Sequence, residues 1–533
     1  MPPDAFGGSG PLTVLLLEFG VMQDDTNMAG TLPLIARAEI YRDRLAIATP
    51  TDTFTYRDLL ERSAQIATAL LCGEADLQEQ RVAFLVPAGF DYVATQWGIW
   101  RAGGIAVPLC TVHPRPELEY AVLQSGASIL VAHPSFAEVL RDIAQTHALR
   151  FLLTTDPLPP AGTLPEIASH RRALILYTSG TTGKPKGVVT THANIQAQVT
   201  SLVEAWAWQQ SDRILHVLPL HHIHGIINVL TCALWVGAVC YMLPKFDAEV
   251  VWQCIEAGNF TLFMAVPTIY AKLIAAWEAA GDGTGQPSPR QQARSAACAQ
   301  MRLMVSGSAA LPVQVLQQWQ QISGHFLLER YGMTEIGMAL SNPLRGDRRA
   351  GFVGTPLPGV EVRLMGEQGI VPAGTPGEIQ VKGPGVFLEY WQNPQATATS
   401  FQDGWFCTGD LAVVEDGSYR ILGRISVDII KTGGYKVSAL EIEEVLRSHP
   451  YICECAVVGV PDAVWGEQVC AALLLEPGKT LELNAFRSWA KDFLAVYKVP
   501  ARILTVQELP RNAMGKVTKR AIVELFQREF GIS

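Results

Sequence analysis

Eleven consecutive residues carry most of the information in this chain: Tyr177-Thr178-Ser179-Gly180-Thr181-Thr182-Gly183-Lys184-Pro185-Lys186-Gly187. They follow an apolar run, Ala173-Leu174-Ile175-Leu176, that predicts a buried strand. Glycines allow backbone N–H groups to converge on an anion, while Ser/Thr hydroxyls and lysines add donors and positive charge. The pattern predicts a strand followed by a loop that holds a polyphosphate.

This loop differs from a Walker A motif, in which Gly-Lys-Ser/Thr opens a helix. Here Pro185 follows Lys184, so a helix cannot begin in the same way. A flexible polar surface loop is the alternative interpretation. Two lysines that flank a proline between glycines favour phosphate binding.

Length and composition indicate a multidomain globular enzyme. A chain of 533 residues is too long for one core and predicts about two to four domains. Hydrophobic residues make up 49% and charged residues 17%, which excludes a disordered chain. The net charge is -9 and no basic run occurs, so nucleic acid is not an expected partner.

The ten cysteines form neither a CxxC pair nor a Cys/His cluster with zinc spacing. Free thiols in a reducing compartment are the simplest interpretation, and we expect a cytoplasmic protein. Cys453 and Cys455 are two positions apart, so a strand would place both on one face.

Residues 1–30 are predicted to be a poorly ordered N-terminal extension. Their apolar run, Val14-Leu15-Leu16-Leu17, is too short for a membrane span and lacks the positive residues of a secretory signal. An Arg-rich amphipathic presequence is also missing. Met22 or Met28 is hypothesised to be the natural start.

Alternating helix-like and strand-like segments predict an α/β fold with covered sheets. Apolar spacing near 3.6 predicts a helix over Tyr56–Leu71, and Arg81–Val86 is a compact strand candidate. Ala280–Arg294 is rich in Gly, Pro, Gln and Ser and predicts an exposed loop. Spaced Gly and Pro over Gly354–Gly383 predict a small antiparallel β-subdomain.

The character of the sequence changes again after Gly423-Arg424. An amphipathic segment over Val437–Leu446 precedes a strand-like run, Cys455–Val460. We therefore expect a large N-terminal domain over residues 31–424 and a small α+β C-terminal domain over residues 425–533.

Seven further segments occur together with the glycine-rich loop. They are His221–Gly225, Ser306–Leu311, Glu329–Glu335, Trp405–Asp410, Gly423–Arg424, Lys431–Gly434 and Pro510–Lys516. In this order they resemble the adenylate-forming superfamily of acyl-CoA synthetases, luciferases and peptide-synthetase adenylation domains. The resemblance covers about residues 31 to 525, nearly the whole chain.

The resemblance implies a two-step reaction with ATP, Mg²⁺ and coenzyme A. A carboxylate attacks the α-phosphate of ATP, and a thiol then displaces AMP. Lys516 would bridge the two anions in the first step and offset their repulsion. A solvated surface lysine is the alternative interpretation of Lys516. The small C-terminal domain is expected to be mobile and to withdraw Lys516 between the steps.

The resemblance also implies a set of site residues. Nucleotide contacts are expected from Thr178, Ser179, Gly180, Thr181, Thr182, Gly183, Lys184, Lys186, Gly307, Ser308, Ala309, Glu329, Arg330, Tyr331, Gly332, Met333, Asp410 and Arg424. Catalytic roles are expected for Lys516, Thr334, Glu335 and His222, with Thr178 and Glu335 at the magnesium ion. Coenzyme A contacts are expected from Lys431, Gly433 and Gly434. The hinge position, commonly Asp or Lys in the family, is occupied by Ser426, with Asp428 two residues on.

Longer stretches add a finer resemblance: Trp206–Trp208, Ile214–His222, Phe263–Tyr270, Glu329–Ala339 and Ser426–Tyr435. They are most similar to malonyl-CoA synthetases of the acyl-CoA synthetase family member three type. A second carboxylate would be costly to bury without a cation or several donors. The candidates for this acyl pocket are His224, Lys272, Ser306 and Arg330, although Arg330 could equally form an ion pair with Glu329 or another acid.

Other functions remain open from the sequence. A fatty or aromatic acyl-CoA synthetase would have an apolar acyl pocket. An acyl-carrier-protein ligase would use a protein thiol. A non-catalytic nucleotide-binding regulator has no chemical need for Lys516, Glu335 and Asp410. The partners expected are small molecules, and the choice between monomer and dimer is open.

Overall fold

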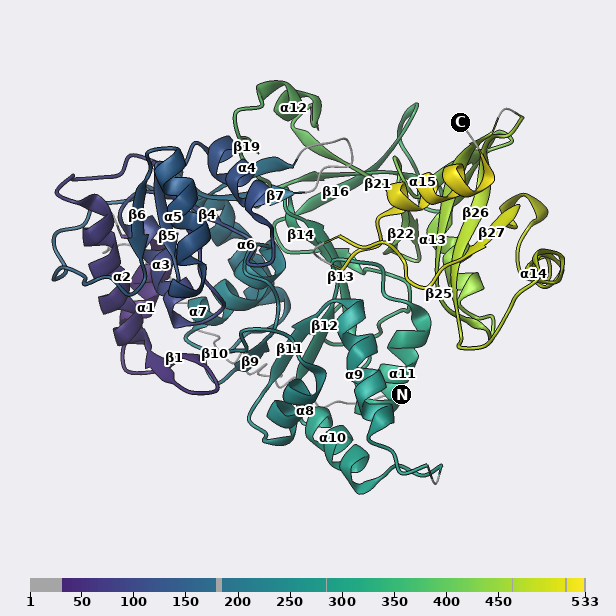
Figure 1. The fold of residues 1–533 in the computed structure, drawn as a ribbon, viewed down its shortest axis with the longest axis horizontal. Coiled ribbons are helices and arrows are strands. Elements are labelled where there is room, and N and C mark those ends of the chain that lie inside the picture. Colours follow the sequence, from purple (N-terminus) through teal and green to yellow (C-terminus); the bar gives the residue numbers. More distant parts are fainter. Residues whose placement is uncertain (1–30, 179–184, 284, 463, 513–514, 532–533) are drawn as a thin grey trace, which may run out of the picture.

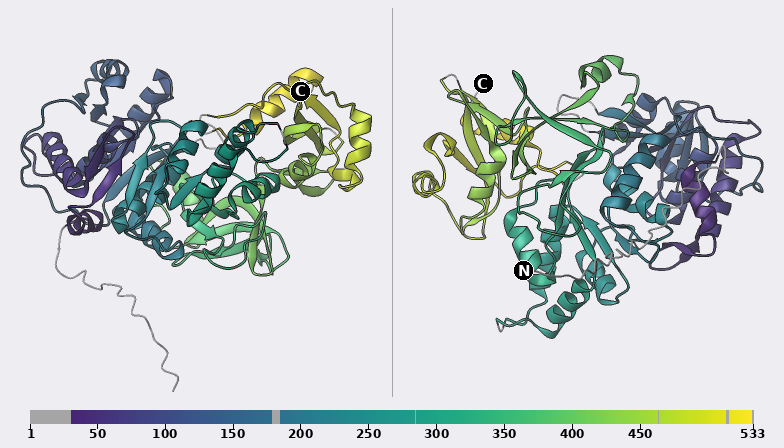
Figure 2. Two further views of the ribbon diagram at one scale, coloured as in Figure 1. Left: turned by 90° about the horizontal axis from the view of Figure 1, so that it is seen from below. Right: turned by 180° about the vertical axis from the view of Figure 1, so that it is seen from behind.

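The structure, a computed structural model, describes residues 31–178, 185–283, 285–462, 464–512 and 515–531. A large part, which ends with strand β22, contains three sheets, and a smaller part from β23 to α15 lies at one end of the molecule (Figures 1 and 2). The expected α/β fold with a large N-terminal part and a smaller C-terminal part is confirmed. Among the described residues, no helix is long and apolar enough to cross a membrane.

One large sheet has seven strands in the order β19-β8-β7-β4-β3-β5-β6. Its strands are β3 (Arg81–Leu85), β4 (Ile105–Pro108), β5 (Ile129–Ala132), β6 (Arg150–Leu153), β7 (Arg172–Thr178), β8 (Lys186–Thr191) and β19 (Glu389–Tyr390). Strands β7 and β8 pair in antiparallel fashion, with Thr178 opposite Lys186. A strand rather than a helix therefore follows the glycine-rich loop, as its proline predicts. Residues 179–184 of that loop lie outside the described residues.

The second large sheet has nine strands in the order β15-β14-β13-β12-β11-β9-β10-β1-β2. Its strands are β1 (Leu45–Ala48), β2 (Thr53–Thr55), β9 (Arg213–His216), β10 (Val239–Met242), β11 (Leu262–Ala265), β12 (Leu303–Ser306), β13 (Leu328–Met333), β14 (Gly337–Ser341) and β15 (Thr355–Pro356). Strands β9 to β13 are parallel. Ligands of such sheets bind beyond the carboxyl ends of the strands, where Gly307, Ser308 and Thr334 lie.

Helices cover both large sheets. They are α1 (Pro33–Ile40), α2 (Tyr56–Leu71), α3 (Phe90–Arg101), α4 (Arg115–Ser125), η1 (Pro134–Phe136), α5 (Ala137–Thr146), α6 (His192–Ala205), η2 (His224–Thr231), α7 (Cys232–Val236), α8 (Ala248–Glu256), α9 (Pro267–Ala279), α10 (Pro289–Ala299), α11 (Val313–Ser323) and α12 (Pro394–Thr399). Helix α2 confirms the predicted helix, and a capping box between Thr55 and Asp58 opens it. The loop predicted over Ala280–Arg294 is wrong in its second half, because Ser288 and Gln291 form a capping box that starts α10.

A third sheet forms the predicted small antiparallel subdomain. Its strands are β16 (Glu361–Gly366), β17 (Gly369–Ile370), β18 (Gly377–Lys382), β20 (Phe401–Gln402), β21 (Trp405–Glu415) and β22 (Ser418–Arg424). The long strands β21 and β22 pair so that Asp410 lies opposite Arg424. Two of the predicted site residues are therefore brought together by strand register.

The C-terminal part contains the fourth sheet, of five strands, with a hydrophobic cluster on each face. Its elements are β23 (Ile429–Thr432), β24 (Tyr435–Ser438), α13 (Ala439–Leu446), β25 (Ile452–Asp462), β26 (Gly466–Leu475), α14 (Leu483–Ala490), η3 (Val496–Lys498), β27 (Arg502–Thr505) and α15 (Lys519–Phe530). The prediction that Cys453 and Cys455 share a face is wrong: Cys453 is exposed and Cys455 is buried. The pairing register shifts between Ile452 and Glu454, which breaks the alternation.

Candidate active site

A buried carboxylate connects the second and third sheets. Asp410 on β21 accepts a hydrogen bond from the Tyr331 hydroxyl at 2.6 Å and from Arg424 Nη1 at 3.1 Å. Burial raises the pKa of Asp410, whereas the Arg424 guanidinium and the Tyr331 hydroxyl oppose that shift. The three predicted nucleotide contacts thus form one cluster. Its carboxylate can accept hydrogen bonds from a diol such as a ribose.

A second buried carboxylate, Glu335, lies in the turn between β13 and β14. Glu335 Oε1 accepts a hydrogen bond from the Tyr390 hydroxyl at 2.8 Å, and the residue is 5% exposed. Burial raises its pKa. The Lys186 ammonium lies 4.9 Å from the centre of the Tyr390 ring. Lys186, which follows the glycine-rich loop, is therefore near Glu335, and Thr334 precedes Glu335 in the same turn.

Arg330 on β13 is the buried cation of this region. It is 3% exposed, and its Nη2 donates a hydrogen bond to Ser308 Oγ at 3.2 Å. Burial lowers its pKa to about 9. Ser308 Oγ also lies 3.2 Å from His224 Nδ1, so a strand end, a loop and a helix meet here. A Cβ atom on Gly307 would lie 2.6 Å from Arg330 Cζ, so a larger residue at this position would force the guanidinium to shift.

The alternative that Arg330 forms an ion pair with Glu329 is wrong. Among the described residues, no carboxylate lies within ion-pair distance of the Arg330 guanidinium. Successive side chains of β13 point to opposite faces, and Glu329 Oε1 instead accepts the Leu311 N–H at 3.2 Å. Burial raises the pKa of Glu329 to about 8.

Several buried polar atoms of β12, β13 and the segment His222–Asn228 have no hydrogen-bond partner within the described part of the chain. They are Arg330 Nε, Ser306 Oγ, His222 Nε2, His224 Nε2 and both amide atoms of Asn228. Buried polar groups are normally paired, so unpaired atoms mark a place where a polar ligand can bind. His222 and His224 are neutral donors, because burial lowers the pKa of each.

Asn228 is a candidate that the sequence analysis missed. It is 1% exposed and follows His224 by four residues in η2, an eight-residue π-helix. At this spacing the two side chains share a helix face. A π-helix is rare and often occurs at functional sites. An asparagine in an otherwise apolar run, Ile226-Ile227-Asn228-Val229-Leu230, was the available signal in the sequence.

Lys516 reaches this region from the C-terminal part. The segment between β27 and α15 extends toward β13 and β14 (Figure 1). The Lys516 side chain is exposed, yet the charges of Arg330, Arg424 and Asp410 are close enough to affect it. Desolvation lowers its pKa, and the charges of Arg330 and Arg424 add to the shift while Asp410 opposes it. The sequence-predicted lysine is thus brought near the nucleotide and acyl candidates.

Lys272 is not brought to the site. It is exposed on α9, with its ammonium 5.9 Å from the centre of the Phe246 ring. Its expected role as a buried acyl-pocket cation is therefore not supported, and Arg330 is the buried cation. Arg302 has a structural role, because it binds Asp212 through two hydrogen bonds of 2.8 and 2.5 Å.

The expected coenzyme A residues form a hairpin turn. Lys431 lies in β23, one residue before the strand ends. Gly433 and Gly434 connect β23 to β24 with φ angles of 56° and 83°. Two consecutive positive φ angles are easily adopted only by glycine. The Gly433 N–H donates to the Trp465 carbonyl at 2.9 Å, and a Cβ atom there would lie 2.8 Å from the Trp465 ring. Glycine is therefore favoured at both turn positions by the backbone conformation, and at Gly433 also by the neighbouring Trp465 ring.

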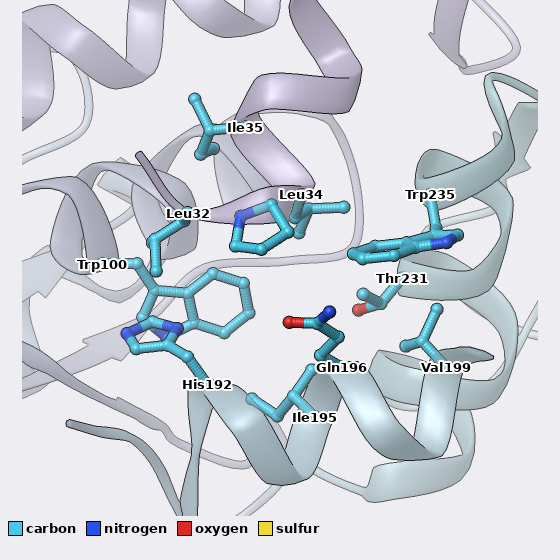
Figure 3. Close-up of a pocket in the computed structure, with 11 residues that line it drawn as sticks. Leu32, Leu34, Ile35, Trp100, His192, Ile195, Gln196, Val199, Thr231 and Trp235 are labelled. Carbon is cyan, nitrogen blue, oxygen red and sulfur yellow. The ribbon is translucent and has the colours of Figure 1, made fainter. Parts of the chain in front are cut away.

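A separate apolar pocket lies under the start of α1, away from these residues. Leu32, Trp100, His192 and Trp235 are among its lining side chains (Figure 3). None of the predicted site residues lines it. None of the described residues that line it is charged, which makes this lining unsuitable for a polyphosphate.

Two protein-family models match most of the chain. Residues 34–391 match the AMP-binding enzyme family, and residues 441–516 match the AMP-binding enzyme C-terminal domain. The chain belongs to the AMP-binding enzyme family. The resemblance found in the sequence motifs is therefore confirmed.

Individual relatives in the AMP-binding enzyme family match nearly the whole chain. The malonate–CoA ligase ACSF3, mitochondrial, of Bos taurus is 47% identical over 94% of this chain and 91% of its own. The malonate–CoA ligase of Arabidopsis thaliana is 40% identical over 91% and 87% of the two chains. The crystal structure of ATP-bound MatB from Rhodopseudomonas palustris superposes with a TM-score of 0.84 at 33% identity, covering 94% and 99% of the two chains.

Proposed function

We propose that this chain is an AMP-forming acid–CoA ligase whose acid is malonate or methylmalonate. The observation that carries the choice of acid is the buried Arg330 guanidinium, which has no carboxylate partner in the described residues and lies beside unpaired polar atoms. An apolar fatty acid would leave those groups unpaired, at a cost of about 1–3 kcal/mol for each. A second carboxylate would pair with them.

The nucleotide is held by residues of three sheets. Asp410 accepts hydrogen bonds from the ribose hydroxyls, and Arg424 and Tyr331 fix the orientation of its carboxylate. The glycine-rich loop, residues 179–184 with the flanking Thr178 and Lys186, holds the phosphates. The remaining wall of the nucleotide site is formed by Gly307, Ser308, Ala309 and the segment Glu329–Met333.

In the first step one carboxylate oxygen of the acid attacks the α-phosphorus, and the bond to pyrophosphate breaks. Lys516 contacts both the attacking carboxylate and the α-phosphate and stabilises the charge that accumulates between them. Thr334 donates to the α-phosphate. In the second step the coenzyme A thiolate attacks the acyl carbon and AMP leaves. The β23–β24 hairpin with Lys431, Gly433 and Gly434 borders the thiol path, and His222 forms its gate.

The residues present fit a magnesium ion. Glu335 is a buried carboxylate whose pKa is raised by burial, so a bound cation would offset the cost of its ionised form. Carboxylate and hydroxyl oxygens such as those of Glu335 and Thr178 are the ligands that Mg²⁺ prefers, and the ion would neutralise phosphate charge.

The acyl pocket is proposed to comprise Arg330, Ser306, His222, His224 and Asn228. Arg330 provides a fixed positive charge, and its guanidinium can bind a carboxylate through two parallel hydrogen bonds. The neutral histidines and the Asn228 amide supply further donors. The names of the relatives from Bos taurus and Arabidopsis thaliana agree with a dicarboxylate substrate.

The assay that tests this function measures AMP release with ATP, Mg²⁺ and coenzyme A. Malonate and methylmalonate are compared with acetate and a long-chain fatty acid. We expect kcat/KM to be at least about a hundredfold higher for the two dicarboxylates than for acetate. A preference for the fatty acid would contradict the assignment of the acid.

An Arg330→Gln variant tests the pocket directly. We expect kcat/KM for malonate to fall by about a hundredfold or more, because the distal carboxylate would lose its charged partner. The matched comparison is acetate in the same variant, which has no second carboxylate and should lose much less. Equal losses with both acids would show that Arg330 acts on the nucleotide instead.

Residues 31–424 and 425–533 are proposed as the two domains, with the second mobile and the hinge between Arg424 and Asp428.

A cytoplasmic location also stays a prediction, and four relatives carry the word mitochondrial in their names. Fluorescence microscopy of the tagged full chain decides it. Overlap with a mitochondrial marker would contradict a cytoplasmic location.

A further inference from the structure

A buried ion cluster joins the hinge segment to the last helix. Lys519, the first residue of α15, has its ammonium 2.6 Å from Asp428 Oδ1 and 2.8 Å from Glu443 Oε1. The side chains of Lys519, Asp428 and Glu443 are 13%, 15% and 5% exposed. Arg447 completes the cluster, 3.3 Å from Glu443 Oε2. Arg447 also lies 3.5 Å from Glu444 Oε2, so two cations and three carboxylates form the cluster, and Lys519, Asp428 and Glu443 are its most buried members.

Asp428 connects this cluster to Arg424, one of the proposed nucleotide contacts. Its Oδ2 accepts the Arg424 N–H at 2.9 Å, and its own N–H donates to the Arg424 carbonyl at 2.7 Å. The Asp428 carbonyl accepts the Ala439 N–H at 2.7 Å, at the start of α13. The Arg424 side chain in turn contacts Asp410. A chain of direct contacts thus leads from Lys519 to the proposed ribose carboxylate.

Lys519 also lies at the base of the segment that carries Lys516. The two arms of this segment are joined by hydrogen bonds from Thr518 N–H to the Pro510 carbonyl at 2.8 Å and from Asn512 N–H to the Lys516 carbonyl at 2.9 Å. Lys516 is three residues before Lys519. The contact between Lys519 and Asp428 therefore fixes the position of this segment, and with it Lys516, relative to the hinge.

Burial makes the cluster sensitive to the loss of one member. Although desolvation disfavours the charged ammonium, Glu443 and Asp428 raise the pKa of Lys519 above its ordinary value. Removing the ammonium would leave two buried carboxylates with a single cation, Arg447. Breaking a buried pair in this way disturbs a structure more than losing an exposed pair.

We propose that Lys519 is a positioning residue for the adenylation step: by joining Asp428 and Glu443 to the start of α15, it fixes where Lys516 meets the substrates. This inference rests on the proposed ligase function. Lys519 itself does not touch the reacting atoms. Displacing a catalytic group by about 1 Å lowers a rate by up to a hundredfold.

The test compares Lys519→Met with Lys498→Met in the full chain, by malonate-dependent exchange of labelled pyrophosphate into ATP. Lys498 forms an ion pair of 2.5 Å with Glu441, also on α13, and stands outside the chain of contacts from Lys519 to Asp410 described above, so it is a matched control. We expect the adenylation rate to fall at least about tenfold in Lys519→Met and less than twofold in Lys498→Met. Lys519→Arg, which keeps the charge, should recover most of the rate.

A double-variant cycle separates positioning from general damage. If Lys519 acts through Lys516, adding Lys519→Met to Lys516→Ala should change the residual rate by less than about twofold, because residues that act as a unit are not additive. Equal rates in Lys519→Met and Lys498→Met, or a full tenfold further loss in the Lys516→Ala background, would overturn the inference.

Two controls keep the outcomes distinct. Absence of pyrophosphate exchange in the unmodified protein would overturn the ligase function rather than the role of Lys519. If Lys519→Met does not fold by circular dichroism, Asp428→Asn replaces it, since it weakens the same ion pair with little change in shape. The same fall in rate, and the same lack of additivity with Lys516→Ala, are expected for Asp428→Asn.

Discussion

At the scale of residues, Arg330 is the buried cation on which the proposed choice of acid depends. Its guanidinium is buried, its pKa is lowered to about 9, and its Nε has no partner in the described structure. Such a group is unfavourable until an anion binds. Binding of a dicarboxylate would satisfy it, so part of the substrate specificity comes from a group that the free protein leaves incompletely paired.

Gly307→Ala tests whether the position of Arg330 matters as well as its charge. The added Cβ would lie 2.6 Å from Arg330 Cζ and 2.6 Å from Arg330 Nε, so the guanidinium must shift. We expect kcat/KM for malonate to fall by about tenfold or more, measured by AMP release. The loss should be larger for malonate than for acetate.

Gly162→Ala is the matched control for that substitution. Its Cβ atom would meet Thr68 Cγ2 at 3.4 Å, an ordinary contact, and Gly162 has no positive φ angle. The control should keep the activity of the unmodified protein. An unchanged preference for malonate over acetate in Gly307→Ala would refute a geometric role for Arg330.

At the scale of elements, the glycine turn of the β23–β24 hairpin has the backbone geometry that the proposed close approach of coenzyme A requires. Both turn residues have positive φ, and the Trp465 ring lies under Gly433. Gly433→Ala would strain the turn and collide with that ring. We expect thioester formation from coenzyme A to slow by about tenfold, while pyrophosphate exchange changes less than twofold, because the hairpin is proposed to act only in the second step.

Gly478→Ala is the control for strain alone. Gly478 lies in the same C-terminal part with φ of 77°, and a Cβ atom there meets nothing within 4 Å. It therefore carries similar backbone strain without a collision. A slowed pyrophosphate exchange in Gly433→Ala would contradict a role restricted to the second step.

Elements with strong local signals were predictable from the sequence. Tyr56–Leu71 has apolar residues at helical spacing, and it forms α2 over the predicted residues. Pro185 correctly excluded a helix after the glycine-rich loop. The motif residues Asp410 and Arg424 were correctly grouped, although their pairing depends on the register of β21 and β22.

Features set by tertiary packing were not predictable. Lys272 and Arg330 are equivalent candidates in sequence, and only their burial separates them. The relation between Glu329 and Arg330 depends on which face of β13 each occupies. The cluster of Lys519 with Asp428 joins residues 91 positions apart, a contact for which a single sequence gives no signal.

At the scale of the whole molecule, several buried histidines are held neutral. Burial lowers the pKa of His192 to about 3 and that of His216 to about 4. Below pH 6.5 the unfolded chain binds protons at these positions and the folded chain does not, so the free energy of unfolding falls. Buried acids such as Glu329, with a raised pKa, act in the opposite direction.

His192→Gln isolates one of these groups, because His192 lines the apolar pocket of Figure 3 and takes no proposed part in catalysis. Between pH 6.5 and pH 5 the free energy of unfolding of the variant should rise by about 1.6 kcal/mol relative to that of the unmodified protein, with a slope that approaches about 1.4 kcal/mol per pH unit at the lower end. Urea unfolding at several pH values measures this difference, with the exposed His170→Gln as control. Parallel pH profiles for His192→Gln and the unmodified protein would mean that His192 becomes protonated in the folded state, and the burial argument would fail.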